Sequence, residues 1–202
     1  MKYIQLKIVA LTIVSTIISA PAAYAESPAI RNCNWCHGAS AQGYTPAPRL
    51  AGQRIRYIEQ QLMSFSDHTR DSPFSRQYMW GAAASLNRET AHDLAVYFSR
   101  LPARAAADGD RNREFVAKGE MIYQRGMPEA NIVACVACHG PSAEGVGDIP
   151  RLGGLAYTYL KRRLQQWGEG YHGAIELPMP HIASKLSRNQ IEALASYLSF
   201  VK

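Results

Sequence analysis

Hydrophobic residues recur along this chain at intervals of three and four, the spacing that places side chains on one face of an α-helix. The clearest stretch is 53–66, where Ile55, Ile58, Leu62 and Phe65 fall on a single face. No stretch alternates apolar and polar residues convincingly enough to predict a β-strand. The pattern therefore predicts an all-α fold. Further helices are predicted over 89–99, 113–125 and 191–200.

Two of the predicted helices carry start signals. Ser187 and Gln190 form a capping-box pair before 191–200, in which each side chain accepts a hydrogen bond from the other residue's backbone N–H. Asn87 stands at the equivalent place before 89–99, and an asparagine side chain can cap a helix in a similar way. The similar starts of these two helices point to a repeat.

The first half of the chain repeats in the second half. A shift of 102 residues, the separation of His37 and His139, aligns Pro48-Arg49-Leu50 with Pro150-Arg151-Leu152. So many matches at fixed offsets indicate a tandem duplication of one module. Other pairs at this shift are Gly52 with Gly154, Tyr57 with Tyr159 and Leu62 with Leu164; after a two-residue deletion, Met79 pairs with Met179, Leu94 with Leu194 and Tyr97 with Tyr197.

The two modules are separated by a short linker. Pro102, three consecutive alanines at 105–107 and the turn Asp108-Gly109-Asp110 interrupt the helical pattern. The sequence therefore predicts a first domain over 26–103, a linker over 104–112 and a second domain over 113–202. Each predicted domain has fewer than 100 residues, a size at which an apolar core alone is marginal.

The N-terminus resembles a secretory signal. Lys2 and Lys7 give a positive start, 8–20 is apolar, and Ala23-Tyr24-Ala25 fits the small-X-small cleavage rule. The sequence predicts a signal peptide over 1–25 and a mature protein in the bacterial periplasm. The alternative is an uncleaved anchor, for which the apolar run is short. No later stretch is apolar enough to cross a membrane, so no transmembrane span is expected in the mature chain.

All four cysteines lie in two copies of the pattern Cys-X-X-Cys-His. The copies are Cys33-Asn34-Trp35-Cys36-His37 and Cys135-Val136-Ala137-Cys138-His139. This pattern is the attachment signature of c-type haem, in which both thiols form thioethers with the haem vinyl groups and the histidine binds the iron. The chain is therefore expected to carry two covalent haem c groups, with His37 and His139 as axial iron ligands.

Three other interpretations of the cysteines are weaker. A shared zinc site would separate its two Cys pairs by about 15–20 residues, far fewer than here, and would leave the histidines unexplained. A thioredoxin-like redox pair needs a βαβ context that the pattern lacks. Structural disulfides suit an exported chain but do not account for the histidines.

The second axial position of each haem decides between electron transfer and catalysis, because a methionine opposite the histidine closes the iron. Met79 and Met179 are matched between the repeats and lie on predicted loops seven residues before a leucine, so both are expected to be axial ligands. The alternative is that one of them only packs in the core. Met63, Met121 and Met127 have no matched methionine, and His68, His92, His172 and His181 are also unmatched and expected at the surface, with His181 the nearest competing ligand.

Residues around each haem histidine are candidates for a supporting role. A metal-bound histidine usually donates its other ring nitrogen to a carbonyl or carboxylate, and Pro48 and Pro150 follow the histidines by eleven residues. Arg49 and Arg151 could pair with haem propionates. Tyr57 and Tyr159 could also bind a propionate or simply pack in the core.

On these residues the chain resembles the dihaem class I cytochromes c, in particular the cytochrome c-four group. The resemblance rests on the paired haem motifs, the Pro-Arg-Leu-X-Gly segments and the Met-X3-Ala-X2-Leu segments at Met79 and Met179. It implies two tandem cytochrome c domains, each wrapped around one covalent haem, with neighbouring haem edges. It also implies that the proline carbonyls accept a hydrogen bond from the haem histidines.

The first module departs from that family pattern. The family's domain opens with a helix that carries a glycine and an aromatic residue and crosses the last helix; the second module has it, with Gly119 and Tyr123. The first module has only 26–32 before Cys33, which is too short for the full helix. Its haem is expected to be more exposed, or covered by the second module or a partner. A second departure is Leu155, where the first repeat has Gln53.

The function expected from the motifs and the resemblance is electron transfer in the periplasm between a redox protein donor and an acceptor, without enzymatic activity of its own. Partners implied are a quinol–cytochrome c reductase or a membrane-bound terminal oxidase. The alternatives are a haem-bearing subunit of a larger redox enzyme complex and, with less support, a dihaem peroxidase. The formal net charge of +6 comes with no nucleic-acid-binding motif.

Overall fold

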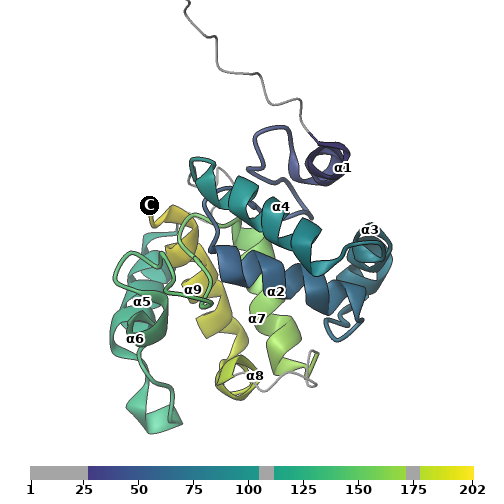
Figure 1. Ribbon diagram of the computed structural model, residues 1–202. Coiled ribbons are helices and arrows are strands. Elements are labelled where there is room, and N and C mark those ends of the chain that lie inside the picture. The colour runs from purple at the N-terminus through teal and green to yellow at the C-terminus, as the bar shows by residue number, and fades with distance from the viewer. Residues whose placement is uncertain (1–26, 105–111, 172–177) are drawn as a thin grey trace, which may run out of the picture.

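The computed structural model describes residues 27–104, 112–171 and 178–202, and every regular element in these ranges is helical (Figure 1). The predicted signal peptide, 105–111 of the predicted linker and His172 lie outside the described residues. The first half, 27–104, contains α1 (Pro28–His37), α2 (Ile55–Ser66), the π-helical turn η1 (Ser75–Met79), α3 (Trp80–Ala83) and α4 (Arg88–Arg100). The second half, from 112 onward, contains α5 (Arg113–Arg125), the short 3-10 turn η2 (Pro128–Ala130), α6 (Val136–His139), α7 (Tyr157–Gly168), α8 (Pro178–Ala183) and α9 (Arg188–Phe200).

The predicted helix starts are confirmed. Asn87 Oδ1 accepts a 2.8 Å hydrogen bond from the backbone N–H of Thr90 at the start of α4. At the start of α9, Ser187 and Gln190 form the reciprocal capping box. Helix α2 begins at Ile55, two residues later than 53, because the N–H of Gln53 closes a turn on the Leu50 carbonyl. No helix in the described part of the chain is long and apolar enough to span a membrane.

Each half has its own apolar core. In the first half α2 packs against α4, and in the second half α9 packs against both α5 and α7. Burying such side chains stabilises each half by roughly 1.5–3 kcal/mol per large apolar residue. The buried residues include Ile58, Leu62, Leu94 and Phe98 in the first core, and Ile122, Tyr123, Leu160, Leu194 and Leu198 in the second.

Helix α5 crosses α9 at close range in the second half. A Cβ atom at Gly119 would overlap the carbonyl of Ala193, so only glycine permits this approach. One turn later Tyr123 is fully buried, and its ring packs against Tyr197 with centroids 5.6 Å apart. These are the glycine and the aromatic residue that the family pattern places on this helix.

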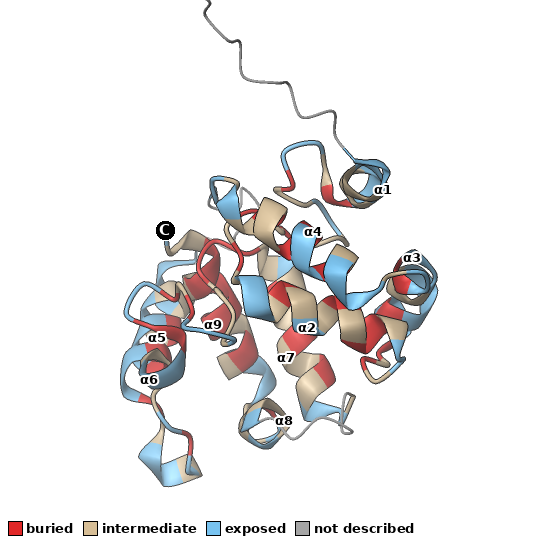
Figure 2. Cartoon of the chain, in the orientation of Figure 1, coloured by how far each residue is buried: buried red, intermediate tan, exposed pale blue. Residues whose placement is uncertain are grey.

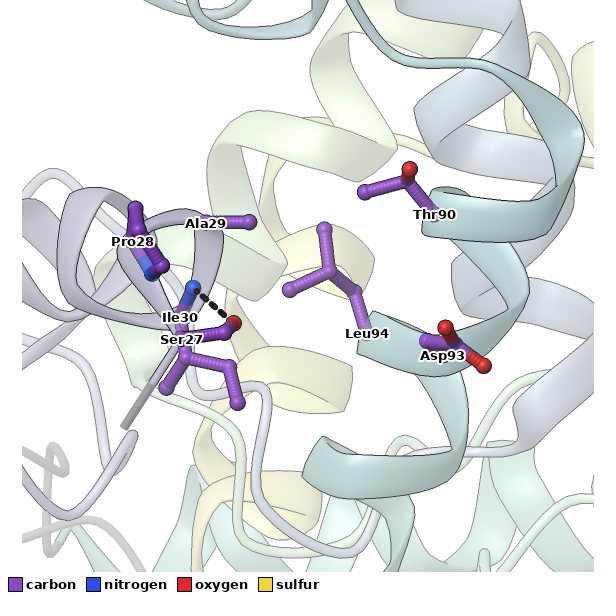
Figure 3. Close-up of a pocket in the computed structure, with 7 residues that line it drawn as sticks. All are labelled: Ser27, Pro28, Ala29, Ile30, Thr90, Asp93 and Leu94. Atoms are coloured by element: carbon purple, nitrogen blue, oxygen red, sulfur yellow. Dashed lines mark hydrogen bonds between the residues drawn. The ribbon is translucent and has the colours of Figure 1, made fainter. Parts of the chain in front are cut away.

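No helix covers α4 in this way among the described residues of the first half. Helix α1 makes only slight contact with α4, and an open groove lies between them. It is lined by Ser27 and the first turn of α1 (28–30) on one side and by Thr90, Asp93 and Leu94 of α4 on the other (Figure 3). Asp93 is exposed, whereas Ala193 at the equivalent place on α9 is fully buried. Figure 2 shows the same contrast, with exposed turns on α4 and a largely buried α9. A charged residue on the uncovered face shows that α4 is adapted to water.

Candidate functional site

The first haem motif forms the last turn of α1. Cys33 and Cys36 lie three residues apart and His37 follows, so a helical turn brings all three side chains to neighbouring positions. Ser27 starts this helix by accepting a hydrogen bond from the Ile30 N–H. Cys33 is half-buried, and burial raises the pKa of its thiol to about 11, while Cys36 is exposed. The motif therefore presents one half-buried thiol, which is neutral at physiological pH, and one cysteine at the surface.

The second motif has the same arrangement on a shorter helix. Cys135 precedes α6, and Cys138 and His139 form its end. Burial raises the pKa of the Cys135 thiol to about 11, and Cys138 is exposed. The two motifs thus match in burial and in order as well as in sequence.

Each motif histidine points one ring nitrogen at a proline carbonyl. His37 Nδ1 lies 2.7 Å from the Pro48 oxygen, and His139 Nδ1 lies 3.0 Å from the Pro150 oxygen. A carbonyl oxygen can only accept, so Nδ1 carries the proton and Nε2 keeps a free lone pair. Both rings are buried, and burial lowers the pKa of both histidines. The neutral imidazole with its Nε2 lone pair is the form that binds a metal.

Matching backbone hydrogen bonds hold both histidines in place. The N–H of Gly43 donates to the His37 carbonyl, and the N–H of Gly145 donates to the His139 carbonyl, each over 2.8 Å. The loop that returns to each proline is closed by the N–H of Leu50 on Ala41 and of Leu152 on Ala143. The duplication therefore extends from the motif to the loop that supports it.

The two matched methionines lie in helical turns rather than in loops. Met79 ends the π-helical turn η1, and Met179 is the second residue of α8. Both are half-buried. The loop expectation was wrong because these turns have only five and six residues, too few for an apolar period to show in the sequence. Next to Met79, Trp80 is anchored by its Nε1–H, which donates to the Arg70 carbonyl over 3.0 Å.

Arg49 reaches across to the second half. Its guanidinium donates to the carbonyls of Gly153 and Gly154, both over 2.7 Å, and to the carbonyl of Arg104. Its Nε is buried without a hydrogen-bond partner. Burial, with Arg151 nearby, lowers the pKa of Arg49 to about 10, so it remains a cation at neutral pH. Arg151, by contrast, is half-buried, and its backbone pairs with the side chain of Gln53.

Tyr57 and Tyr159 meet between the two halves, together with a buried arginine that sequence reasoning missed. Arg70 donates to Gln61 Oε1 over 2.6 Å and to the Tyr159 hydroxyl over 3.5 Å. Arg163, also missed, is buried on α7 and donates to Gln166. Burial of an arginine depends on how the halves pack, so the only local signal was the place of Arg163 on the amphipathic helix α7, and Arg70, between α2 and η1, had none.

These features fit a haem group. The ion pairs of the described residues involve neither Arg49 nor Arg70, and each of these buried arginines has an Nε–H without a partner. A buried cation requires an anionic or strongly accepting partner, and haem carries two propionates. Together with the free thiols and the histidine lone pairs, the donor set is that of covalently attached haem.

The competing interpretations of the cysteines find no support. The described residues contain no group of three or more His, Cys, Asp or Glu side chains that could hold a metal ion, so the two Cys pairs do not meet at a shared zinc site. All four cysteines are free, which excludes structural disulfides in this arrangement.

Comparison with known proteins agrees with the site. The family model for cytochrome c matches residues 116–202. Cytochrome c-552 of Acidithiobacillus ferridurans is 32% identical over 196 residues, covering 94% of this chain and 84% of that protein. A "thiosulfate dehydrogenase electron acceptor" of Stutzerimonas stutzeri is 36% identical over 180 residues, covering 87% of this chain and 81% of that protein.

Among solved structures, cytochrome c4 of Acidithiobacillus ferrooxidans superposes with a TM-score of 0.77 at 32% identity, covering 84% of this chain and 98% of that chain. With 84% of the chain covered, the match extends over both halves. The chain thus belongs to the cytochrome c4 group of dihaem class I cytochromes c, all-helical electron-transfer proteins with two covalently bound haem c groups.

Proposed function

We propose that this protein carries electrons in the periplasm through two closed iron centres, with His37 and Met79 as axial ligands of the first and His139 and Met179 as ligands of the second. The observation that carries the proposal is the pair of Nδ1–carbonyl hydrogen bonds, which leave both Nε2 atoms free to bind iron. Bound haem supplies the one-electron chemistry.

The protein's own residues hold, bury and orient the haem groups and their histidine ligands. Cys33, Cys36, Cys135 and Cys138 attach the haems covalently, and the proline carbonyls fix the histidine rings in one tautomer and raise their basicity as ligands. Arg70 and Arg163, beside Tyr57 and Tyr159, place positive charge and hydroxyl groups between the halves, where they would bind propionates. Arg49 adds a partnerless Nε–H at the same boundary.

We also propose the boundaries 26–103 for the first domain and 113–202 for the second, with 1–25 removed on export. Electrons would enter from a donor such as a quinol–cytochrome c reductase, pass between the haems and leave to a membrane-bound terminal oxidase. This role requires no acid–base pair, because outer-sphere electron transfer moves no proton at the protein.

The test of the ligand set is visible spectroscopy of the purified ferric protein. The weak absorption band that marks methionine bound to haem iron is measured against total haem, in the unaltered protein and in Met79→Ala and Met179→Ala. We expect two haems' worth of band, halved by each substitution. Met63→Ala, which removes a half-buried methionine from α2, is the control and should leave the band intact. A band that ignores Met79→Ala or Met179→Ala would refute the assignment at that site.

A second candidate is the electron-accepting subunit of a larger redox enzyme. Two observations favour it: relatives named thiosulfate dehydrogenase electron acceptor, and the uncovered face of α4 in the first half. The ferric protein would be mixed with a thiosulfate dehydrogenase and thiosulfate, and its reduction followed in the visible spectrum. Rapid, saturable reduction together with co-elution of the two proteins would support a permanent subunit. A monomer that never co-elutes would favour the free carrier.

A further inference from the structure

The side chain of Gln53, in the first half, forms two hydrogen bonds with the backbone of Arg151 in the second half. Its Oε1 accepts the Arg151 N–H over 2.7 Å, and its Nε2–H donates to the Arg151 carbonyl over 2.9 Å. Gln53 is only 6% exposed, and its Oε1 also accepts the N–H of Arg54, which fixes the side chain from its own half. The contact is therefore a rigid, buried link between the halves.

The Arg151 N–H that donates to Gln53 belongs to the same peptide group whose oxygen contacts the second haem histidine. The carbonyl of Pro150 and the N–H of Arg151 form one peptide unit, and the Pro150 oxygen lies 3.0 Å from His139 Nδ1. Hydrogen bonds at the two ends of one amide polarise each other, so donation to Gln53 makes the Pro150 oxygen a stronger acceptor. A hydrogen-bond chain thus runs from Gln53 through one peptide group to His139.

Arg49 steadies the residues that follow this peptide. Its guanidinium holds the carbonyls of Gly153 and Gly154, two and three residues beyond Arg151. The first half therefore forms hydrogen bonds with Arg151, Gly153 and Gly154, which follow Pro150. These contacts limit rotation of the Pro150–Arg151 peptide and keep its oxygen aimed at the ring of His139.

The contact has no counterpart in the reverse direction, from the second half to the haem-histidine peptide of the first half. The repeat position of Gln53 is Leu155, an apolar residue in the core of the second half, which has no amide to offer to the Pro48–Arg49 peptide. The second half does reach back through Arg162, which donates to the Pro46 carbonyl over 2.8 Å. That carbonyl lies two residues before Pro48 and is not part of the peptide that His37 contacts.

We propose that Gln53 is a positioning residue for the second haem, acting across the boundary between the halves on the hydrogen bond that tunes His139. The proposal rests on the proposed binding of iron by His139. A stronger Nδ1–H···O bond gives the imidazole more anionic character, which stabilises ferric over ferrous iron. Gln53 thus lowers the reduction potential of the second haem below the value that it would have without this contact.

The test is Gln53→Leu, which installs the residue that the repeat itself carries. In the ferrous protein labelled with ¹⁵N-histidine, the Nδ1–H resonance of His139 should move upfield while that of His37 stays in place. The reduction potential of the second haem should shift upward, with that of the first unchanged. Gln42→Leu is the matched control, because the Gln42 side chain also forms two hydrogen bonds with the backbone, one to the Pro102 carbonyl and one from the Arg104 N–H.

Gln42→Leu should leave both resonances and both potentials unmoved. A second variant, Gln53→Glu, keeps an acceptor for the Arg151 N–H and should not move the His139 resonance upfield. Loss of stability in Gln53→Leu with an unmoved His139 resonance and potential would overturn the proposal and make the contact purely structural. If the unaltered protein held no haem at His139, both the ligand assignment and this inference would fail, and the visible spectrum would distinguish that case.

Discussion

Tyr123 supports the second haem motif through a single hydroxyl. Its ring is fully buried, and its O–H donates a 2.6 Å hydrogen bond to the carbonyl of Gly140, the residue after His139. Burial raises the pKa of this phenol, so the hydroxyl remains a donor throughout the neutral range. The bond ties α5 to the end of α6 and fixes the backbone beside the haem histidine.

Removal of that hydroxyl in Tyr123→Phe should lower the free energy of unfolding by about 0.5–1.5 kcal/mol, because the buried Gly140 carbonyl loses one of its two hydrogen bonds and keeps only the one from the Ala143 N–H. The measurement is denaturant unfolding of the holoprotein. Tyr44→Phe is the control: its hydroxyl donates to the Trp35 carbonyl at the surface, where water can replace it. That change should cost less than about 0.5 kcal/mol. Equal losses in the two variants would refute a special role for Tyr123.

Single residues differ in how far the sequence reveals them. The cysteines and histidines of the two motifs could be predicted because their chemistry needs only five consecutive residues. Gln53 and Arg70 could not, because each acts on a partner in the other half that no local pattern identifies. Arg49 was predicted to pair with a propionate, and its position next to Pro48 did not reveal the glycine carbonyls that it binds.

At the scale of elements, periodicity and capping predicted the long helices well. The predicted range 113–125 coincides with α5, and the predicted caps at Asn87 and Ser187 are formed. The family resemblance also led us to expect no full opening helix in the first module, and the described residues of the first half contain no counterpart of α5. The short helical turns that carry Met79 and Met179 were missed because nucleation by a few residues depends on tertiary support, which leaves no periodic signal.

The crossing of α5 and α9 depends on the missing side chain of Gly119. In Gly119→Ala the new methyl group would meet the Ala193 backbone carbonyl, which cannot move without displacing α9. We expect the free energy of unfolding to fall by about 1–3 kcal/mol, the usual cost of overpacking, or by more. Thermal unfolding of the holoprotein measures it.

Gly81→Ala is the control for this change, because Gly81 lies in the helix α3 and a Cβ there meets nothing within 4 Å. Alanine at such a site is neutral or stabilising, by up to about 1 kcal/mol. A Gly119→Ala protein as stable as Gly81→Ala would show that α5 can shift away from α9, and that the second half folds without the tight crossing.

For the whole molecule, the boundary between the halves is built from buried and half-buried polar groups rather than from an apolar core. Arg49, Gln53, Arg70 and Arg162 each hold a carbonyl, an amide or a hydroxyl of the opposite half. Directional bonds of this kind fix the relative orientation of two domains more sharply than apolar contact does. A fixed orientation suits electron transfer between two haems, because the rate depends on the distance and angle between them.

Arg49 contributes directly to this orientation, since it bonds to the carbonyls of Gly153 and Gly154 in the opposite half and to that of Arg104 in its own. In Arg49→Met the side chain keeps its bulk but loses every donor, and the glycine carbonyls of the second half are left buried and unpaired. The free energy of unfolding should fall by about 1–3 kcal/mol, and hydrogen exchange at 151–155 should accelerate. Arg31→Met, at an exposed site on α1, should change neither. Unchanged exchange at 151–155 in Arg49→Met would mean that the halves are held together by the haems and not by this arginine.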